Sequence, residues 1–302
     1  MGFDSLFYQP VILGKDSTHD TIQYYSIINS LQWSNFKPLD TLPDKKYFFR
    51  VAGGIMHEYV NAITPYYQGN TFTIFGRFHT RLFSVMDLYG RIAYSFNGYN
   101  KNDMVAAIGT KWMIQKKWNH FLGLEADFYR NSPDYIYENY YGNHNVWFCK
   151  DWPKQNTLKL SAFWSILKYR VELNYFMAHN LVRLNEIYEP FITEKAANLV
   201  QLHIFAPVRI KGFGLNLNAY LQYSNSTSLT VPLLAFKASP YYVFNFLRGK
   251  LKMQIGLDLM YNTSYYADGY DPVLHQFYCQ QKMLVGNYAY LDANITLKIK
   301  RI

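Results

Sequence analysis

The chain has 302 residues, of which 50% are hydrophobic, 19% aromatic and 17% charged, and its formal net charge is +9. A disordered protein is excluded, because disordered chains are poor in aromatic residues and rich in charge. A helical multi-pass membrane protein is also excluded. Even the long charge-free stretch at residues 213–236 is interrupted by Asn, Gln, Ser and Thr, so it offers no run of about 18 apolar residues.

The whole chain is expected to form one domain, because no segment of residues 1–302 has the composition of a linker. Its basic residues are spread along the chain, so no nucleic-acid-binding face is expected. Cys149 and Cys279 are too few for a disulfide framework, and they could be paired or free. The first residues lack the basic and apolar regions of a secretion signal, so either a signal was removed or the chain is a piece of something longer.

Apolar and polar residues alternate strictly in several stretches, which predicts β-strands with one apolar and one polar face. Near residue 251, for example, Leu251, Met253 and Ile255 alternate with Lys252 and Gln254. In chain order, the clearest stretches lie at residues 122–128, 169–177, 215–222, 251–259 and 291–299.

About fourteen strands are expected, an even number as in bacterial outer-membrane barrels. Most are longer than the roughly 5–6 residues usual in globular proteins. They match the about 9–11 residues that a tilted strand needs to cross a bilayer. The predicted strands are residues 3–13, 20–35, 46–60, 69–83, 87–97, 102–114, 119–130, 155–165, 168–180, 196–208, 212–224, 236–247, 250–262 and 285–300.

Short and long connections alternate between these strands. Outer-membrane barrels have tight turns at the periplasmic rim and long loops at the extracellular rim. The sequence therefore predicts an all-β fold, an antiparallel up-and-down transmembrane β-barrel. Tight turns are expected at residues 83–87, 115–118, 166–167, 209–211 and 248–249, and longer connections at 61–68, 98–101, 131–154, 181–195, 225–235 and 263–284.

Tyrosines near the predicted strand ends are expected to form an aromatic girdle, with their rings in lipid and their hydroxyls among the headgroups. The alternative is that they pack under loops or inside an ordinary β-sandwich, and a sandwich leaves little use for so many long strands. The expected girdle residues are Tyr241, Tyr242, Tyr265, Tyr266, Tyr288 and Tyr290.

Several motifs resemble the putative porin family of Bacteroidota outer membranes. Residues 286–292 (GNYAYLD) are similar to that family's "IGNYPYIDVF", with Ala289 in place of its proline, and residues 140–147 (YYGNHNVW) are similar to its "SNHF-W" loop. The resemblance covers most of the chain and is most specific at residues 253–300. It implies an outer-membrane β-barrel of the porin type. Members are normally longer, so this chain would be a short or truncated member, and the number of strands in the closed barrel stays open.

Charged residues on the polar strand faces are the main functional candidates. In a barrel they face the lumen, because a charge facing lipid at mid-bilayer costs about 2–4 kcal/mol. The excess of cations would favour anions or neutral polar solutes. The alternative is that ladders of opposite charge merely hold the strand register. The candidate lumen residues are Arg77, Arg81, Arg91, Glu125, Asp127, Lys159, Lys168, Arg170, Glu172, Lys250, Lys252, Asp258 and Asp292.

Motifs for other chemistry are weak. Asp268 and Asp271 supply only two carboxylates, fewer than a calcium loop needs, so a structural turn is the better interpretation. The histidines do not have zinc-ligand spacing. Nucleophile-elbow, Walker A and dinucleotide motifs are missing from the sequence. We therefore expect no metal, no cofactor and no catalysis, although a triad in the barrel wall stays open because its members need not be close in sequence.

The expected function is passive passage of small polar or anionic solutes through the outer membrane of a Gram-negative cell. One alternative is a plugged barrel that serves as a scaffold or partner in a lipoprotein or secretion assembly, with residues 131–154 and 263–284 as contact surfaces. A second is a barrel-wall enzyme acting on lipid. The expected partners are outer-membrane lipids and small solutes, with a second copy or a lipoprotein as further options.

Overall fold

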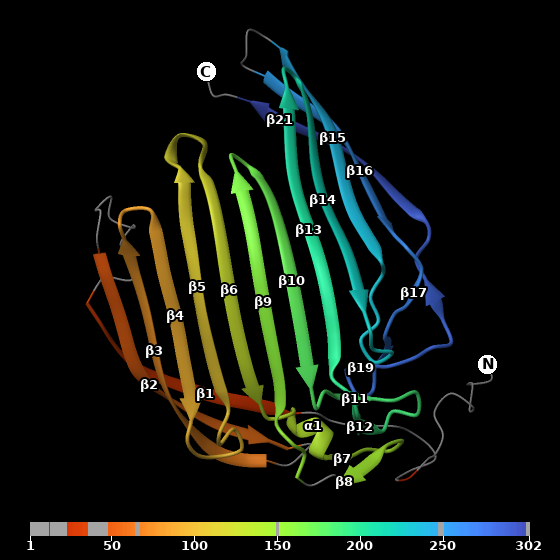
Figure 1. The fold of residues 1–302 in the computed structure, drawn as a ribbon. Helices are drawn as coiled ribbons and strands as arrows, with labels where there is room; N and C mark the ends of the chain where they lie inside the picture. The colour runs from red at the N-terminus through yellow and green to blue at the C-terminus, as the bar shows by residue number, and fades with distance from the viewer. Residues whose placement is uncertain are drawn as a thin grey trace, which may run out of the picture.

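The computed structural model describes residues 12, 23–35, 48–63, 67–148, 151–246 and 251–299. Over these residues, thirteen long strands form one sheet in which every neighbouring pair is antiparallel and adjacent in chain order (Figure 1). The strands are β1 (Tyr24–Ser34), β2 (Phe48–Ala62), β3 (Tyr67–Leu82), β4 (Met86–Ser95), β5 (Met104–Gln115), β6 (His120–Asn131), β9 (Gln155–Ile166), β10 (Tyr169–His179), β13 (Ala197–Ile210), β14 (Phe213–Ser224), β15 (Leu234–Phe246), β16 (Leu251–Asn262) and β21 (Ala289–Ile299).

The all-β, up-and-down fold predicted from the alternation is confirmed. Every predicted strand from 20–35 onward is present, with bounds that differ by a few residues. The predicted strand 3–13 lies outside the described residues except for Ile12, which is not in a strand. The described part of the chain contains no helix long and apolar enough to span a bilayer.

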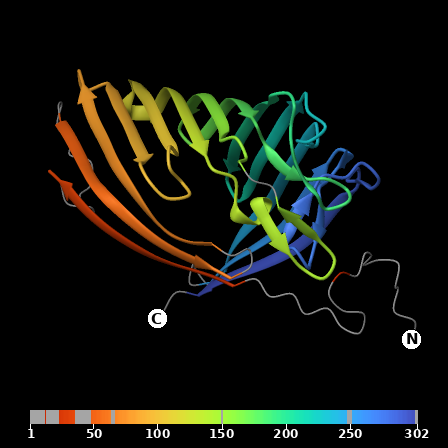
Figure 2. The same ribbon diagram turned by 90° about the horizontal axis from the view of Figure 1, so that it is seen from below.

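The sheet curls into a trough with β1 and β21 as its two edges (Figure 2). Within the described residues, no backbone pairing joins β1 to β21. Tight connections lie at one end of the trough and long loops at the other (Figure 1). One predicted turn is displaced: Leu167, with a φ of 55°, begins the turn between β9 and β10. The strand resumes at Tyr169, so Lys168 is a turn residue and not part of the strand wall.

The register separates the two faces of the sheet by polarity. Apolar residues lie opposite apolar ones, as Leu202 does between Leu173 and Leu221. Polar residues lie opposite polar ones, as Gln201 does next to Asn174. The apolar face is the more exposed, since Leu173 and Leu221 are each 50% exposed, whereas Asn174 is 4% exposed. Side chains crowd on a concave surface and spread on a convex one, so the polar face is concave and the apolar face convex.

The largest fully buried side chains lie in the long loops. Three of these loops contribute to one cluster of buried side chains: Ile136, Tyr140, Trp147, Leu184 and Leu274. We call this part of the protein the loop unit, and Figure 1 shows α1 and the β7–β8 hairpin at the loop end of the strands. Its elements are α1 (Tyr135–Glu138), β7 (Asn139–Tyr141), β8 (Val146–Phe148), β11 (Val182–Leu184), β12 (Pro190–Ile192), β17 (Tyr265–Tyr266), β18 (Gly269–Asp271), β19 (Gln276–Tyr278) and β20 (Leu284–Val285).

Candidate functional site

The concave face carries nearly all of the charged residues singled out in the sequence. Cross-strand pairs connect them, since Arg77 lies opposite Arg91, Asp127 opposite Lys159, and Asp258 opposite Asp292. Lys250 lies outside the described residues, and Lys168 is in a turn. The register places these on the concave face: Arg77, Arg81, Arg91, Glu125, Asp127, Lys159, Arg170, Glu172, Lys252, Asp258 and Asp292.

Some of these charges hold the wall together. Arg81 lies opposite Asp87, and its Nε and Nη2 donate to the two carboxylate oxygens at 2.6 and 3.1 Å. The Arg81 side chain is only 13% exposed. Arg170 similarly pairs with Glu172 on the same strand at 2.8 Å. The Arg81–Asp87 pair, which joins two strands, matches the alternative in which opposite charges fix the register.

Arg91 differs from Arg81 in its exposure. Its closest carboxylate oxygen, on Asp127, is 3.5 Å from Nη2 and is reached across the intervening Ala107. Nη2 also donates to the hydroxyl of Tyr129 at 2.7 Å. The Arg91 side chain is nevertheless 57% exposed. It is therefore held in position while part of its charge faces the space inside the trough.

A ladder of uncharged polar side chains crosses the middle of the concave face. Ser161 donates to Asn174 at 2.6 Å, Asn174 to Gln201 at 3.5 Å, and Gln201 to Gln222 at 2.9 Å. It spans β9, β10, β13 and β14. These residues were not among the predicted site residues, because that prediction considered charged side chains only. They could have been found from the sequence as uncharged polar residues at the inward-facing positions of their strands.

The basic residues gather on β2, β3 and β4. Arg50 lies opposite His79, two residues along β3 from Arg77, and was not singled out in the sequence. A cavity of about 220 Å³ is lined by Arg50, Arg77, Phe78 and His79. A second, of about 360 Å³, is bordered by Arg77 and Arg91 and also by Glu125 and Asp127. The concave face thus offers guanidinium groups next to open space, which suits the binding of anions.

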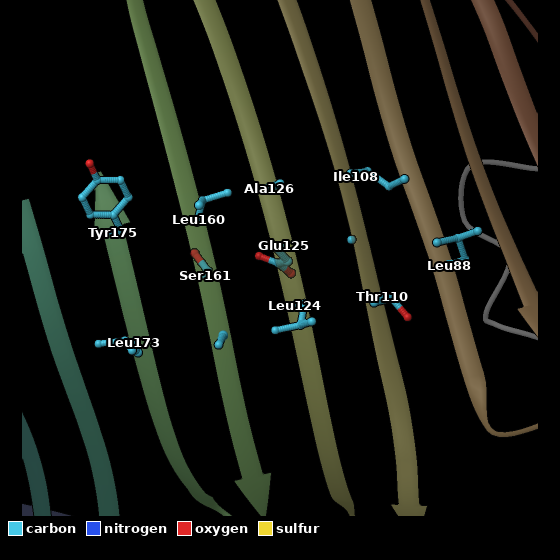
Figure 3. A pocket seen from close by; sticks show the side chains of 12 residues that line it. Leu88, Ile108, Thr110, Leu124, Glu125, Ala126, Leu160, Ser161, Leu173 and Tyr175 are labelled. Atoms are coloured by element: carbon cyan, nitrogen blue, oxygen red, sulfur yellow. The ribbon is translucent and has the colours of Figure 1, made fainter. Parts of the chain in front are cut away.

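The convex face has a hollow of a different kind. Figure 3 shows its leucine and isoleucine side chains, among them Leu88, Ile108 and Leu173, on one side of the strands, with Glu125 and Ser161 directed to the other side. The hollow measures about 490 Å³ and is almost wholly apolar. It therefore fits contact with hydrocarbon and not the passage of a polar solute.

The predicted girdle tyrosines do not share one location. Tyr242 is on the convex face and is 47% exposed. Tyr241 is opposite Gly214 and Gly256 on the concave face, with its ring over Gly214. Tyr290 is also on the concave face, opposite Met260, and its hydroxyl bonds that of Tyr288. Tyr265 and Tyr266 form β17 in the loop unit.

Other aromatic residues occupy convex positions near the strand ends. Tyr59, Tyr94 and Tyr223 are near the loop end, and Trp112 and Trp164 near the turn end. These residues are not clustered in the sequence, so the girdle prediction did not include them. Counting alternate positions along each strand would have identified them, because alternate side chains face the same side of the sheet. A girdle at these positions is therefore a better match to the register.

The acidic residues of the loop unit have structural partners. The Asp271 carboxylate accepts hydrogen bonds from the backbone N–H groups of Val273 and Leu274, each at 2.8 Å, which fixes a turn. Asp268 forms an ion pair with Arg183 at 2.5 Å. No group of three or more metal-ligating side chains occurs in the part of the chain that the structure describes.

Burial raises the pKa of two other groups in the loops, a carboxyl and a thiol. It raises the pKa of Glu138, which lies in α1. It also raises the pKa of the Cys279 thiol, whose Sγ is 3.8 Å from the carbonyl oxygen of Ser228. Cys149 lies outside the described residues. A thiol with a raised pKa is a poor nucleophile, so Cys279 fits a packing role.

Comparison with known proteins gives a family and a fold. The model of a family described as "Putative porin" matches residues 3–302. A search of curated proteins gives no match. Among solved structures, the ferric enterobactin receptor of Pseudomonas aeruginosa is similar with a TM-score of 0.63 and 10% identity, over 91% of this chain and 46% of that one.

Other outer-membrane structures match comparably. The FrpB iron transporter of Neisseria meningitidis gives a TM-score of 0.54 at 8% identity, over 92% of this chain and 48% of that one. The siderophore receptor PirA of Pseudomonas aeruginosa also gives 0.54, at 10% identity, over 92% of this chain and 57% of that one. The chain thus spans about half the length of these proteins, and the likeness concerns the fold.

Proposed function

Because the chain belongs to the putative porin family, we propose that it forms a water-filled channel through which small polar or anionic solutes diffuse passively. The chain is an outer-membrane protein of Gram-negative cells. In this proposal residues 1–302 belong to a single barrel domain, and no catalytic step takes place. The observation that carries the proposal is the division of the sheet into a convex apolar face and a concave charged one.

The polarity of the two faces indicates which face of the sheet contacts lipid and which faces water. A soluble protein rarely leaves a large continuous apolar patch exposed, yet Leu124, Leu173 and Leu221 are each 48–50% exposed on the convex face. Charged side chains turned toward lipid at mid-bilayer would cost about 2–4 kcal/mol each. The convex face therefore suits lipid, and the concave face suits a lumen filled with water.

The charges on the concave face support a preference for anions. Basic residues gather on β2, β3 and β4, and Arg91 is more than half exposed. Rings or patches of Arg and Lys that line a pore favour anions by lowering their electrostatic energy. The amide ladder at Ser161, Asn174, Gln201 and Gln222 adds an uncharged polar wall, which would admit neutral polar solutes as well.

Conductance through a planar lipid bilayer tests the proposal. Purified full-length protein is expected to give stepwise currents, and in a KCl gradient the reversal potential should have the sign of an anion preference. A cation preference would contradict the solute class while leaving the channel in place. A complete lack of current steps from protein that is folded, as judged by heat-modifiable migration in gels, would contradict the channel.

A second candidate function is a plugged barrel that acts as a scaffold for an outer-membrane partner. The loop unit favours it, because loops with a buried core of their own lie at one end of the strands (Figure 1) and overlap the space within the curved sheet when seen from that end (Figure 2). The two functions make opposite predictions for deletion of residues 263–284. Current that appears only after the deletion would indicate a plug, and unchanged current would indicate an open channel.

The third alternative, a barrel-wall enzyme acting on lipid, has its own test. Release of lysolipid from phospholipid vesicles by the purified protein would indicate this enzyme.

A further inference from the structure

The apolar surface of the convex face ends at the same level on three neighbouring strands. Arg130 on β6 lies opposite Asn156 on β9, and Asn156 lies opposite His179 on β10. Arg130 has the same outward position in its strand as Ala126 and Phe128. All three polar residues lie at the loop end of the strands. Long loops are extracellular in outer-membrane barrels, so these residues, which we call the headgroup row, are at the level of the extracellular lipid headgroups.

The headgroup row offers both donors and an acceptor. The side chains of Arg130 and His179 are exposed. Within the described part of the chain, no carboxylate forms an ion pair with either of them. Asn156 donates from Nδ2 to the carbonyl oxygen of Lys154 at 3.3 Å, so its Oδ1 is directed to accept from another group. A guanidinium and an imidazole suit a phosphate, and the amide oxygen suits a hydroxyl.

The apolar hollow of about 490 Å³ lies directly below the headgroup row on the same strands. Ala126, which lines it, is four residues from Arg130, or about 13 Å along β6. The hollow exists because small side chains lie between larger ones, as Ala126 does between Ile108 and Leu160 (Figure 3). An empty hollow loses the dispersion contacts of its walls, and an acyl chain can restore them.

We propose that the headgroup row and this hollow bind one phosphorylated glycolipid of the extracellular leaflet. Its phosphate accepts from Arg130 and His179, a sugar hydroxyl donates to Asn156, and one acyl chain fills the hollow. Arg130 and His179 are two strand spacings apart, about 10 Å, which a disaccharide headgroup spans and a glycerol headgroup does not. The site lies outside the pore and goes beyond the channel function, because it requires only that the convex face contacts lipid.

Lipid retention by the detergent-solubilised full-length protein tests the site. Native mass spectrometry counts the lipids that remain on the folded protein after incubation. The probes are lipid A, which is a phosphorylated disaccharide with acyl chains, its dephosphorylated form and phosphatidylglycerol. Lipid A is expected to bind at about tenfold lower concentration than either of the others. Equal binding of the dephosphorylated form would overturn the recognition of phosphate, and equal or tighter binding of phosphatidylglycerol would overturn the glycolipid as the occupant.

Two double variants test the headgroup row. Arg130→Gln with His179→Gln is expected to raise the half-saturating concentration of lipid A about tenfold. Lys117→Gln with Lys211→Gln is the control, because it removes two exposed basic residues from tight turns at the opposite end of the strands. This control should leave the half-saturating concentration unchanged. An equal effect of the two double variants would overturn the row and indicate only the net charge of the protein.

A bulky side chain in the hollow tests the site of the acyl chain. Ala126→Phe is expected to raise the half-saturating concentration about fivefold. Ala219→Phe is the control, because Ala219 is also on the convex face, on β14, and is not among the residues that line the hollow. If Ala126→Phe does not fold, Ala162→Leu fills part of the same hollow and should act in the same direction. Equal affinities of the hollow variant and the Ala219 variant would overturn the hollow as the chain site.

The result is independent of conduction. Retention of lipid A that is lost in the headgroup-row variant supports the site even if no current is seen in planar bilayers and the channel function fails. Currents from a protein that retains no lipid A would overturn the lipid site and leave the channel function standing.

Discussion

Tyr89 donates a hydrogen bond from its hydroxyl to the carboxylate of Glu125, two strands away across β5. The residue between them is Gly109, and the Tyr89 ring lies over its backbone. The contact across the concave face thus depends on a position with no side chain. It links β4 to β6 over β5, next to the arginines of β3 and β4.

Gly109→Ala is expected to destabilise the sheet. A Cβ atom at this position would lie 2.5 Å from the Tyr89 ring, so the ring must move and lose its bond to Glu125. Overpacking of this kind costs about 1–3 kcal/mol, measured as a lower urea midpoint for unfolding from lipid vesicles. Gly76→Ala is the control, because a Cβ there meets its nearest atoms at 3.8 Å. Equal midpoints for the two variants would contradict the close packing of Tyr89.

The assignment of the faces can be tested with neighbouring residues of β14. Leu217→Arg places a charge on the convex face, and Asn216→Arg places one on the concave face, where Asn216 is exposed. The first is expected to lower the free energy of unfolding from vesicles by about 2–4 kcal/mol, and the second to change it little. The reverse order would mean that the convex face does not contact lipid.

Arg81 and Arg91 are expected to differ in their effects on ion selectivity. Arg91→Gln should move the reversal potential toward cations, because the Arg91 side chain is 57% exposed in the trough. Arg81→Gln should move it less, since Arg81 is 13% exposed and is neutralised by Asp87. Arg81→Gln should instead lower stability, because it leaves the Asp87 carboxylate without its bidentate partner. Equal shifts in reversal potential would contradict the distinction between wall and lumen charges.

Trp147 is expected to be essential for the loop unit but not for the sheet. It is 8% exposed, stacks on Tyr140 with 4.9 Å between ring centroids, and donates to the carbonyl of Ile136 at 2.8 Å. Trp147→Ala should destabilise the loop unit by about 3–5 kcal/mol, seen as faster proteolysis within residues 131–154. Phe148→Ala, at a neighbouring position that is 68% exposed, is the control. A slower or unchanged cleavage rate for Trp147→Ala would contradict the packed loop unit.

The loop unit is also expected to respond to pH through Glu138. Burial raises the pKa of this carboxyl above its ordinary value of 4.5, so the folded loop binds the proton more tightly than the unfolded loop does. The resulting stability is fully present below the ordinary value and is lost as pH rises through the raised one. Proteolysis within residues 131–154 should therefore become faster across that interval in the wild type, and Glu138→Gln should remove the dependence. A rate that instead falls with rising pH would contradict the raised pKa.

The sheet could be predicted from the sequence because the alternation of apolar and polar residues can be recognised within each single strand. Leu251, Met253 and Ile255 alternate with polar neighbours, and a single strand facing lipid and water must show that pattern wherever it lies. The short turns set the neighbours of each strand, since antiparallel strands joined by a tight turn must pair. The same alternation predicts that Arg77, Arg91 and Asp127 lie on the polar faces of their strands, and the register brings them to one face of the sheet.

The groups that depend on register could not be predicted in the same way. Whether Arg77 lies opposite Arg91 depends on the length of one turn to within a residue, and a shift of one residue moves every side chain to the other face. Tyr241 and Tyr242 are adjacent in sequence, yet they are on opposite faces, so their clustering misled the girdle prediction. The loop unit was missed because Ile136, Leu184 and Leu274 come from three separate loops with no common period.

The two edge strands of the sheet set a rule for its closure. In an up-and-down order of thirteen strands, β1 and β21 run in the same direction, since every second strand does. Each edge carries a row of backbone groups, and hydrocarbon provides no water to satisfy them, at a cost of several kcal/mol per group. Antiparallel closure between these edges therefore requires an odd number of additional strands, and an even number leaves a parallel seam. Whether the number of additional strands is odd or even therefore decides whether the sheet closes into a fully antiparallel barrel or into a barrel with one parallel strand pair.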